Sequence, residues 1–419
     1  MTGPHPAPAE TASVPADISL ADLPLREDLR GEQPYGAPQP DVPVRLNVNE
    51  NPYPPSATVI AEIAAAVAEA TASINRYPDR EFLALRAELG RFLTADSGGG
   101  LVRLEPENIW AANGSNEIMQ QLLQAFGGPG RTALSFAPTY SMYPEYARNT
   151  HTRWVVGHRA ADFSIDTAHA VGLISQHRPS VVILTSPNNP TGTALPLETV
   201  RAVLAIAPGV VIVDEAYAEF RRDGVPSAVS LLPAHPRLIV TRTMSKAFAY
   251  AGGRLGYLAA TRAVVDAVRI VRLPYHLSAV AQAAAHAALS HRSEALARVQ
   301  DLRSARDDTI TWLREHGFSA ADSDANFVLF GRFRDRHSRW QGLLDRGVLI
   351  RETGPDGWLR VSVGTTAEMA AFRAALLQVA PGGNELPAVR DNGRQDAGAD
   401  AASGSADRAA SPADEGVGR

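Results

Sequence analysis

The chain has 419 residues, and 45% of them are apolar, which is enough to bury a large core. It contains no cysteine, which excludes disulfides, thiolate metal sites and a cysteine nucleophile, and its 11 histidines lack the paired spacing of a zinc site. The formal net charge of -5, without a basic block, argues against nucleic-acid binding. No apolar run approaches membrane length and the N-terminus does not resemble a signal peptide, so we expect a cytoplasmic protein that does not bind a membrane.

Both ends of the chain are polar and rich in small residues. Residues 1–20 are rich in Pro, Ala, Thr and Ser, and residues 383–419 in Gly, Ala and Asp. Such segments cannot bury enough apolar surface to fold, so we expect two disordered tails.

Between the tails, short β-branched runs alternate with helical patterns as far as Pro274. Several of these runs are apolar at consecutive positions, which is typical of strands buried on both faces of a parallel sheet. The strand candidates are 108–113, 132–136, 153–157, 180–186, 209–215, 237–243 and 255–260.

After Pro274 the pattern changes to two long helices, three strands and a last helix. The sequence therefore predicts an α/β fold with two domains: a large one at 56–281 with a mostly parallel central sheet, and a smaller α+β domain at 282–382. The elements of the smaller domain are expected at 279–290, 293–316, 326–330, 348–352, 358–364 and 366–379.

The chain has a single lysine, Lys246, because the other 39 of its 40 basic residues are arginines. One explanation is chance survival of one lysine. The other is chemical, since a lysine amine can lose its proton and form an imine with a carbonyl, whereas arginine stays protonated. Lys246 follows a strand, between hydroxyls at Thr243 and Ser245 and a guanidinium at Arg254, which suits an amine held beside a phosphate. A surface lysine in an ordinary loop is the alternative.

Asp214 and Tyr217 lie at the end of the strand at 209–215. Ligands of α/β sheets bind outside the carboxyl ends of the strands, so an acid there is well placed to meet one. A helix cap is the simpler alternative for Asp214.

Three more loops after strands carry polar or aromatic groups. The PNNPTG turn contains Asn189, the NGSNE loop at 113–117 precedes a helix whose first amides would attract a phosphate, and a PTY loop supplies Tyr140 for stacking. The structural alternatives are a plain turn, a helix cap at Ser115 and a core tyrosine.

In their order along the chain, these motifs resemble those of the histidinol-phosphate aminotransferases, within the class I and II aminotransferases. The resemblance covers residues 22–380. The motifs are NENP (49–52), NGSNE (113–117), PTY (138–140), PNNPTG (187–192), DEAY (214–217), TMSKAFAYAGGRLG (243–256) and LRVSVG (359–364).

The resemblance implies an enzyme of fold type I that depends on pyridoxal 5'-phosphate (PLP) and transaminates L-histidinol phosphate with 2-oxoglutarate in histidine biosynthesis. Lys246 would bind PLP covalently, Asp214 would pair with the pyridine nitrogen, Asn189 and Tyr217 would bind the ring oxygen, and Tyr140 would stack on the ring. The residues implied around the cofactor phosphate are Gly114, Ser115, Asn116, Thr243, Ser245 and Arg254.

The resemblance also implies substrate contacts. Arg360 matches an arginine that binds a carboxylate, and Arg351 matches a second arginine; a guanidinium suits a carboxylate and a phosphate equally, although ordinary salt bridges would also explain both. Tyr35 is similar to a tyrosine that reaches the substrate phosphate, unless it only packs the N-terminal segment.

Residues 21–55 are expected to pack against the small domain and a dimer partner, so the resemblance implies a homodimer with shared active sites. Asn49 and Tyr53 lie in the segment that family members contribute across the dimer. Some relatives have tyrosine directly after the Asn-Glu pair, where this chain has Asn51, so the residue that completes the phosphate site stays open between Asn51 and Tyr53.

Other activities share these motifs, namely an aromatic amino-acid aminotransferase and a threonine-phosphate decarboxylase. The DLRGEQPYGAP and LPYHLS segments favour the histidinol-phosphate group. A PLP-sensing regulator would need an N-terminal DNA-binding domain, for which residues 1–20 leave no room.

Overall fold

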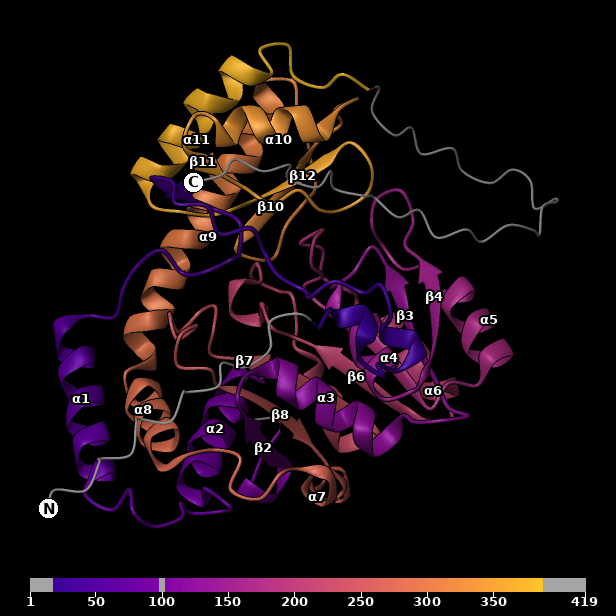
Figure 1. Ribbon diagram of the computed structural model, residues 1–419, viewed down its shortest axis with the longest axis vertical. Coiled ribbons are helices and arrows are strands. Elements are labelled where there is room, and N and C mark those ends of the chain that lie inside the picture. The colour runs from indigo at the N-terminus through magenta and orange to yellow at the C-terminus, as the bar shows by residue number, and fades with distance from the viewer. Residues whose placement is uncertain (1–17, 98–101, 387–419) are drawn as a thin grey trace, which may run out of the picture. The chain divides into compact units, whose positions relative to one another are not determined.

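A computed structural model describes residues 18–97 and 102–386 (Figure 1). Most of both predicted tails, 1–17 and 387–419, therefore lies outside the described residues. The first residues of the predicted C-terminal tail are hydrogen-bonded: the backbone N–H of Asn384 donates to Gly317 at 3.0 Å, and that of Leu386 to Arg332 at 2.9 Å. These bonds involve backbone atoms, which leave no trace in a hydrophobic pattern.

The larger core surrounds a seven-stranded sheet. β7, β6, β5, β3 and β4 run parallel, whereas β8 is antiparallel to both of its neighbours. Every residue of β5 and β6 is buried, as the consecutive apolar positions predict, so the mostly parallel sheet is confirmed. In spatial order the strands are β2 (Ile109–Ala112), β8 (Gly256–Ala260), β7 (Leu238–Thr243), β6 (Val210–Asp214), β5 (Val181–Thr185), β3 (Thr132–Ala137) and β4 (Arg153–His158) (Figure 1).

The helices of this half connect the strands or pack beside them. Ser56 and Ser278 begin two of the helices, α1 and α8, because each side chain accepts a hydrogen bond from a backbone N–H of the first turn. The helices are α1 (Ala57–Thr71), α2 (Leu83–Asp96), α3 (Ser115–Phe126), α4 (Met142–Asn149), α5 (Thr167–His177), α6 (Leu197–Ile206), α7 (Arg262–Val271) and α8 (Ala279–Ser290).

The C-terminal part has its own hydrophobic cluster, which includes Leu313, Phe330 and Phe372. It contains a three-stranded antiparallel sheet in the order β12-β10-β9, and a parallel pair of β1 with β11. The domain boundaries given above stay a prediction. The elements are β1 (Val44–Arg45), α9 (Arg292–Glu315), β9 (Ser319–Ala320), β10 (Phe327–Gly331), α10 (Arg336–Leu344), β11 (Val348–Leu349), β12 (Trp358–Ser362) and α11 (Thr366–Val379).

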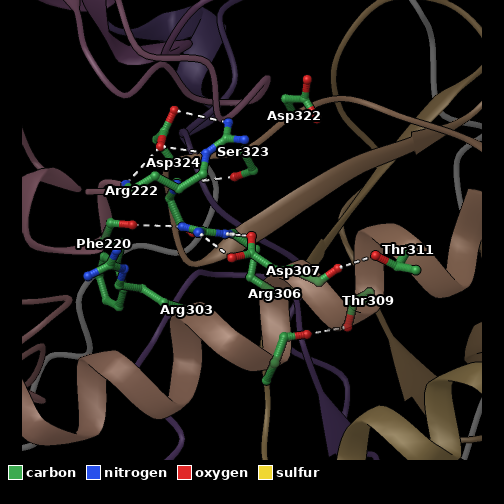
Figure 2. A network of polar contacts seen from close by, with 12 residues as sticks. Phe220, Arg222, Arg303, Arg306, Asp307, Thr309, Thr311, Asp322, Ser323 and Asp324 are labelled. Carbon is green, nitrogen blue, oxygen red and sulfur yellow. Dashed lines mark hydrogen bonds and ion pairs between the residues drawn. The ribbon is translucent and has the colours of Figure 1, made fainter. Parts of the chain in front are cut away.

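A polar network joins α9 to the loop before β10 and to the chain that follows β6 (Figure 2). The fully buried Arg306 donates from Nη1 to the carbonyl oxygen of Phe220 at 2.7 Å. Asp324 accepts from the backbone N–H of Arg222 at 2.9 Å and from its Nε at 3.0 Å. The loop at 321–326 is therefore fixed to the half of the chain that contains the large sheet.

Within residues 18–97 and 102–386, no helix is both long and apolar enough to cross a membrane.

Candidate active site

A cavity of about 430 Å³ lies at the carboxyl ends of the parallel strands. Thr185 ends β5, Asp214 ends β6 and Thr243 ends β7, and all three line this cavity, as expected for ligand sites of α/β sheets. It brings together all but two of the residues expected at the site. Those lining it are Tyr35, Asn49, Ser115, Asn116, Tyr140, Asn189, Asp214, Tyr217, Thr243, Ser245, Lys246, Arg254, Arg351 and Arg360.

The two exceptions are Gly114 and Tyr53. Gly114 is close behind the lining: it has φ +89°, and a Cβ there would overlap the guanidinium of Arg254. Tyr53 lies outside the lining, and its ring centroid is 5.1 Å from the guanidinium carbon of Arg298. Asn51 also lies outside the lining, since its Nδ2 donates to the carbonyl oxygen of Ala247 at 3.2 Å.

Lys246 is partly buried, and its Nζ donates to the backbone carbonyl of Val48 at 2.9 Å. Burial lowers the pKa of this amine to about 8, and the positive charges of Arg360 and Arg254 also lower it, whereas Glu50 acts in the opposite direction. A substantial neutral fraction therefore exists near physiological pH, which an amine needs to act as a nucleophile or a base.

Asp214 is a buried carboxylate with three hydrogen-bond donors. Its Oδ2 accepts from the hydroxyl of Tyr143 at 2.7 Å, and its Oδ1 accepts from Thr241 and from the backbone N–H of Ala216, each at 3.2 Å. Burial raises the pKa of Asp214, and the bonds from Tyr143 and Thr241 oppose that rise. The helix-cap alternative for Asp214 is wrong, because this carboxylate caps no helix of the described residues and lines the cavity instead.

Two arginines, Arg360 and Arg351, bring cationic groups into the lining of the cavity. Arg360 donates from Nη2 to the carbonyl oxygen of Asn47 at 2.8 Å and from Nη1 to Asn189 Oδ1. Burial lowers the pKa of Arg360 to about 10, so it stays charged at neutral pH. Arg360 Nε and Arg351 Nη1 are buried with no hydrogen-bond partner among the described residues. Buried guanidinium N–H groups without acceptors suit an anionic ligand.

A second polar region adjoins the start of α3. Ser115 is the first residue of that helix and Gly114 its cap, with no side-chain capping bond, so the cap proposed for Ser115 is wrong. Ser245 accepts from Thr243 Oγ1 at 3.0 Å and from Arg254 Nη1 at 3.3 Å. Hydroxyls, a guanidinium and a helix N-terminus together favour a phosphate here.

Sequence reasoning missed the groups that hold the site residues in place. Tyr143 and Thr185 form a 3.0 Å hydroxyl pair behind Asp214, and no motif marked either. Tyr143 could have been found from its position three residues after Tyr140 at the start of a helix. The carbonyls of Asn47 and Val48 could not, because every residue has one.

The titration of Lys246 tests this electrostatic description. Acetylation of Lys246 by acetic anhydride in the cofactor-free protein, followed by peptide mass spectrometry to separate it from the N-terminal amine, should be half-maximal near pH 8. Arg360→Gln should move the midpoint upwards and Glu50→Gln should move it downwards, because the two charges act in opposite directions. A midpoint near that of an exposed lysine, unaffected by either change, would refute the description.

The comparisons with known proteins agree with this chemistry. The family model for aminotransferase class I and II matches residues 41–376. Histidinol-phosphate aminotransferase 3 of Burkholderia lata is 63% identical over 362 residues, covering 86% of this chain and 97% of the relative. The histidinol-phosphate aminotransferase of Thermobifida fusca is 63% identical over 360 residues, covering 86% and 96%.

A solved structure is similar over most of the chain. The histidinol-phosphate aminotransferase of Sinorhizobium meliloti, in complex with pyridoxal-5'-phosphate, has a TM-score of 0.70 and 26% sequence identity, covering 81% of this chain and 91% of that one. With the family model matching most of the sequence, and relatives this similar over nearly their full length, this chain belongs to the class I and II aminotransferases.

Proposed function

We propose that this protein transfers the amino group of L-histidinol phosphate to 2-oxoglutarate, giving imidazole-acetol phosphate and L-glutamate, in histidine biosynthesis. The observation that carries the proposal is a cavity whose lining combines the only lysine of the chain, a buried carboxylate, and buried guanidinium N–H groups that have no partner within residues 18–97 and 102–386. Relatives that are 54–63% identical carry the name of this activity.

Pyridoxal 5'-phosphate is the cofactor of this protein. When bound, it supplies an aldehyde that joins to amines and a protonated ring that withdraws electrons from the substrate Cα. The residues present fit such a group: Lys246 offers the amine, Asp214 a buried carboxylate for the ring nitrogen, and Ser115, Ser245 and Arg254 a place for the phosphate.

We assign the proton transfers to Lys246. With cofactor and substrate bound, its neutral Nζ would be the group that removes the proton from the substrate Cα and later returns it to the adjacent carbon. Asp214 would hold the proton of the ring nitrogen, because a desolvated carboxylate favours a cationic partner. Tyr140 would stack on the ring, and Asn189 and Tyr217 would bind its oxygen.

The arginines explain how one site accepts two substrates. The backbones of Arg360, on β12, and Arg351, just after β11, form an isolated antiparallel bridge, so the two residues lie directly opposite each other. We propose that they bind the carboxylate of 2-oxoglutarate in one half-reaction and the phosphate of histidinol phosphate in the other, with Tyr35 closing over the phosphate. We place the reaction in the cytoplasm, where such charged metabolites are retained.

A half-reaction panel tests the substrate. The PLP form is mixed with histidinol phosphate, phenylalanine or phosphothreonine, and loss of the visible band of the lysine-linked cofactor is followed. Histidinol phosphate should react with about 10- to 100-fold higher kcat/KM than phenylalanine, because its dianionic phosphate offers three acceptor oxygens where phenylalanine has one carboxylate, and each additional charge-assisted bond contributes about 1.5–3 kcal/mol. Lys246→Ala should form no borohydride-reducible linkage and should show no reaction.

Two results would replace the proposal. Faster reaction with phenylalanine would identify an aromatic amino-acid aminotransferase. Release of carbon dioxide from phosphothreonine would identify the decarboxylase.

The phosphate-binding region is tested at a glycine. Gly114→Ala places a Cβ against Arg254, so it should weaken PLP binding by about tenfold or more through loss of a charge-assisted contact. Gly130→Ala is the matched control, since Gly130 also has a positive φ of +75° but a Cβ there meets nothing within 4 Å. Cofactor dissociation constants measured by fluorescence should separate the two; equal weakening would show that backbone strain alone is responsible.

We also propose a homodimer with shared active sites. The segments at 74–77 and 270–275 meet where Tyr77 stacks on Tyr275 with ring centroids 4.4 Å apart. Tyr77 is 80% exposed, Ile270 84% and Leu273 73%. Clustered exposed apolar side chains of this kind are typical of a protein interface.

Light scattering tests the dimer. The wild type should have twice the 44.6 kDa chain mass, and Leu273→Asp should shift it towards the monomer and lower activity, because a charge is costly in an apolar interface. Leu377→Asp, at an exposed leucine of α11, should leave the mass unchanged. A monomeric wild type with full activity would contradict the proposal.

A further inference from the structure

Asn49 has every polar group paired, although it lies in a short loop segment. It is buried and has the left-handed φ of +57°, which asparagine adopts more readily than most residues with a Cβ. Its backbone N–H donates to Ser362 Oγ at 2.9 Å, and its carbonyl accepts from Asn326 Nδ2 at 3.0 Å. Its side chain then bridges Ser362 and Tyr217. Such complete pairing fixes the side chain in one place.

Ser362 distinguishes the two ends of the Asn49 amide. Its Oγ accepts the backbone N–H of Asn49 and donates its single proton to Asn49 Oδ1 at 2.9 Å. With the amide turned round, the Ser362 proton would have no acceptor among the hydrogen bonds of the described residues, which is costly for a buried hydroxyl. The serine therefore directs Asn49 Nδ2 away from itself.

Asn49 Nδ2 donates to the hydroxyl oxygen of Tyr217 at 3.0 Å. A phenol that accepts from an amide N–H keeps its own proton for another partner. Tyr217 lines the cavity, and the charged or titratable groups acting on it are Arg360, Asp214 and Tyr35. None of these accepts its proton in a hydrogen bond within the described part of the chain, so the cavity is where that proton can be donated.

We propose that Ser362 is a positioning residue, which orients the Asn49 amide so that Tyr217 acts as a hydrogen-bond donor to the ring oxygen of the cofactor. This rests on the proposed function, because the acceptor is the oxygen of bound PLP. Ser362 is on β12 and Tyr217 follows β6, so the contact links the C-terminal sheet to the large sheet through one amide.

The surroundings keep this arrangement rigid. Asn326, which holds the carbonyl of Asn49, ends the loop whose Asp324 is bound by Arg222 (Figure 2). The backbone N–H of Asp324 also donates to the carbonyl oxygen of Gly192, in the turn that contains Asn189, at 2.8 Å. Both groups expected at the ring oxygen, Tyr217 and Asn189, are thus connected to the same loop.

The test is a spectrophotometric titration of the holoenzyme. Loss of a donor makes the ring oxygen more basic, so it holds the proton of the Lys246–cofactor linkage more tightly and the pKa of that linkage rises. Ser362→Ala lets the amide turn so that Tyr217 donates to Asn49 Oδ1. The linkage pKa should rise by about 0.5 to 1 unit, the size expected for one hydrogen bond. Ser362→Thr, which keeps the hydroxyl, should restore the wild-type value.

A double-mutant cycle separates positioning from general damage. Tyr217→Phe should raise the linkage pKa itself, and adding Ser362→Ala to it should give no further rise, because the donor is already absent. Ser180→Ala is the matched control: this hydroxyl donates to the carbonyl of Thr132 at the far end of β5 and should leave the pKa unchanged.

The outcomes are distinguishable. An unchanged linkage pKa in Ser362→Ala, or an additive rise in the double variant, would overturn the assignment to Ser362 and leave the proposed function intact. Absence of any visible Lys246–cofactor band in the wild type would instead overturn the proposed function.

Discussion

The site depends on how the backbone of residues 46–50 supplies hydrogen-bond acceptors to buried cations. The carbonyl of Val48 accepts from Lys246, and that of Asn47 accepts from Arg360. The segment is itself held by the C-terminal sheets, since the backbone of Leu46 bonds to Leu349 and Ser362. A desolvated ammonium or guanidinium needs such partners, because leaving its donors unpaired would cost free energy. Lys246, from the half of the chain with the large sheet, and Arg360, from the C-terminal part, are thereby kept in one cavity.

The fold was predictable where burial leaves a pattern in the residues. Continuous apolar runs gave β5 and β6 within one residue at each end, and the acids that follow marked the carboxyl edge. The direction of β8 was not predictable, because an apolar strand of five residues has the same pattern in either orientation. Strand β11 is shorter than expected, since Arg351 pairs with Arg360 only as an isolated bridge.

The site was predictable where the type of a side chain indicates its chemistry. Lys246 stands out because arginine replaces lysine everywhere else, and Arg254 and Asp214 stand in motifs. The contacts that orient them were not predictable. Ser362 and Asn49 are 313 positions apart, and their pairing depends on a left-handed turn and a strand register that only the folded chain specifies. Asn49, expected across a dimer interface, lines the cavity of its own chain, because its amide reaches Tyr217.

The same arginines that would bind anionic substrates also tune the amine. Arg360 and Arg254 lower the pKa of Lys246 by charge repulsion, so they raise the neutral fraction of the amine in the free site, which the proposed attack on an aldehyde requires. An anion bound to either guanidinium neutralises part of that charge. Because the two binding equilibria are thermodynamically coupled, the proton affinity of the amine must rise when the anion binds, and the anion must bind more tightly when the amine is protonated. In the proposed reaction the neutral fraction of Lys246 is therefore larger before an anionic substrate binds than afterwards.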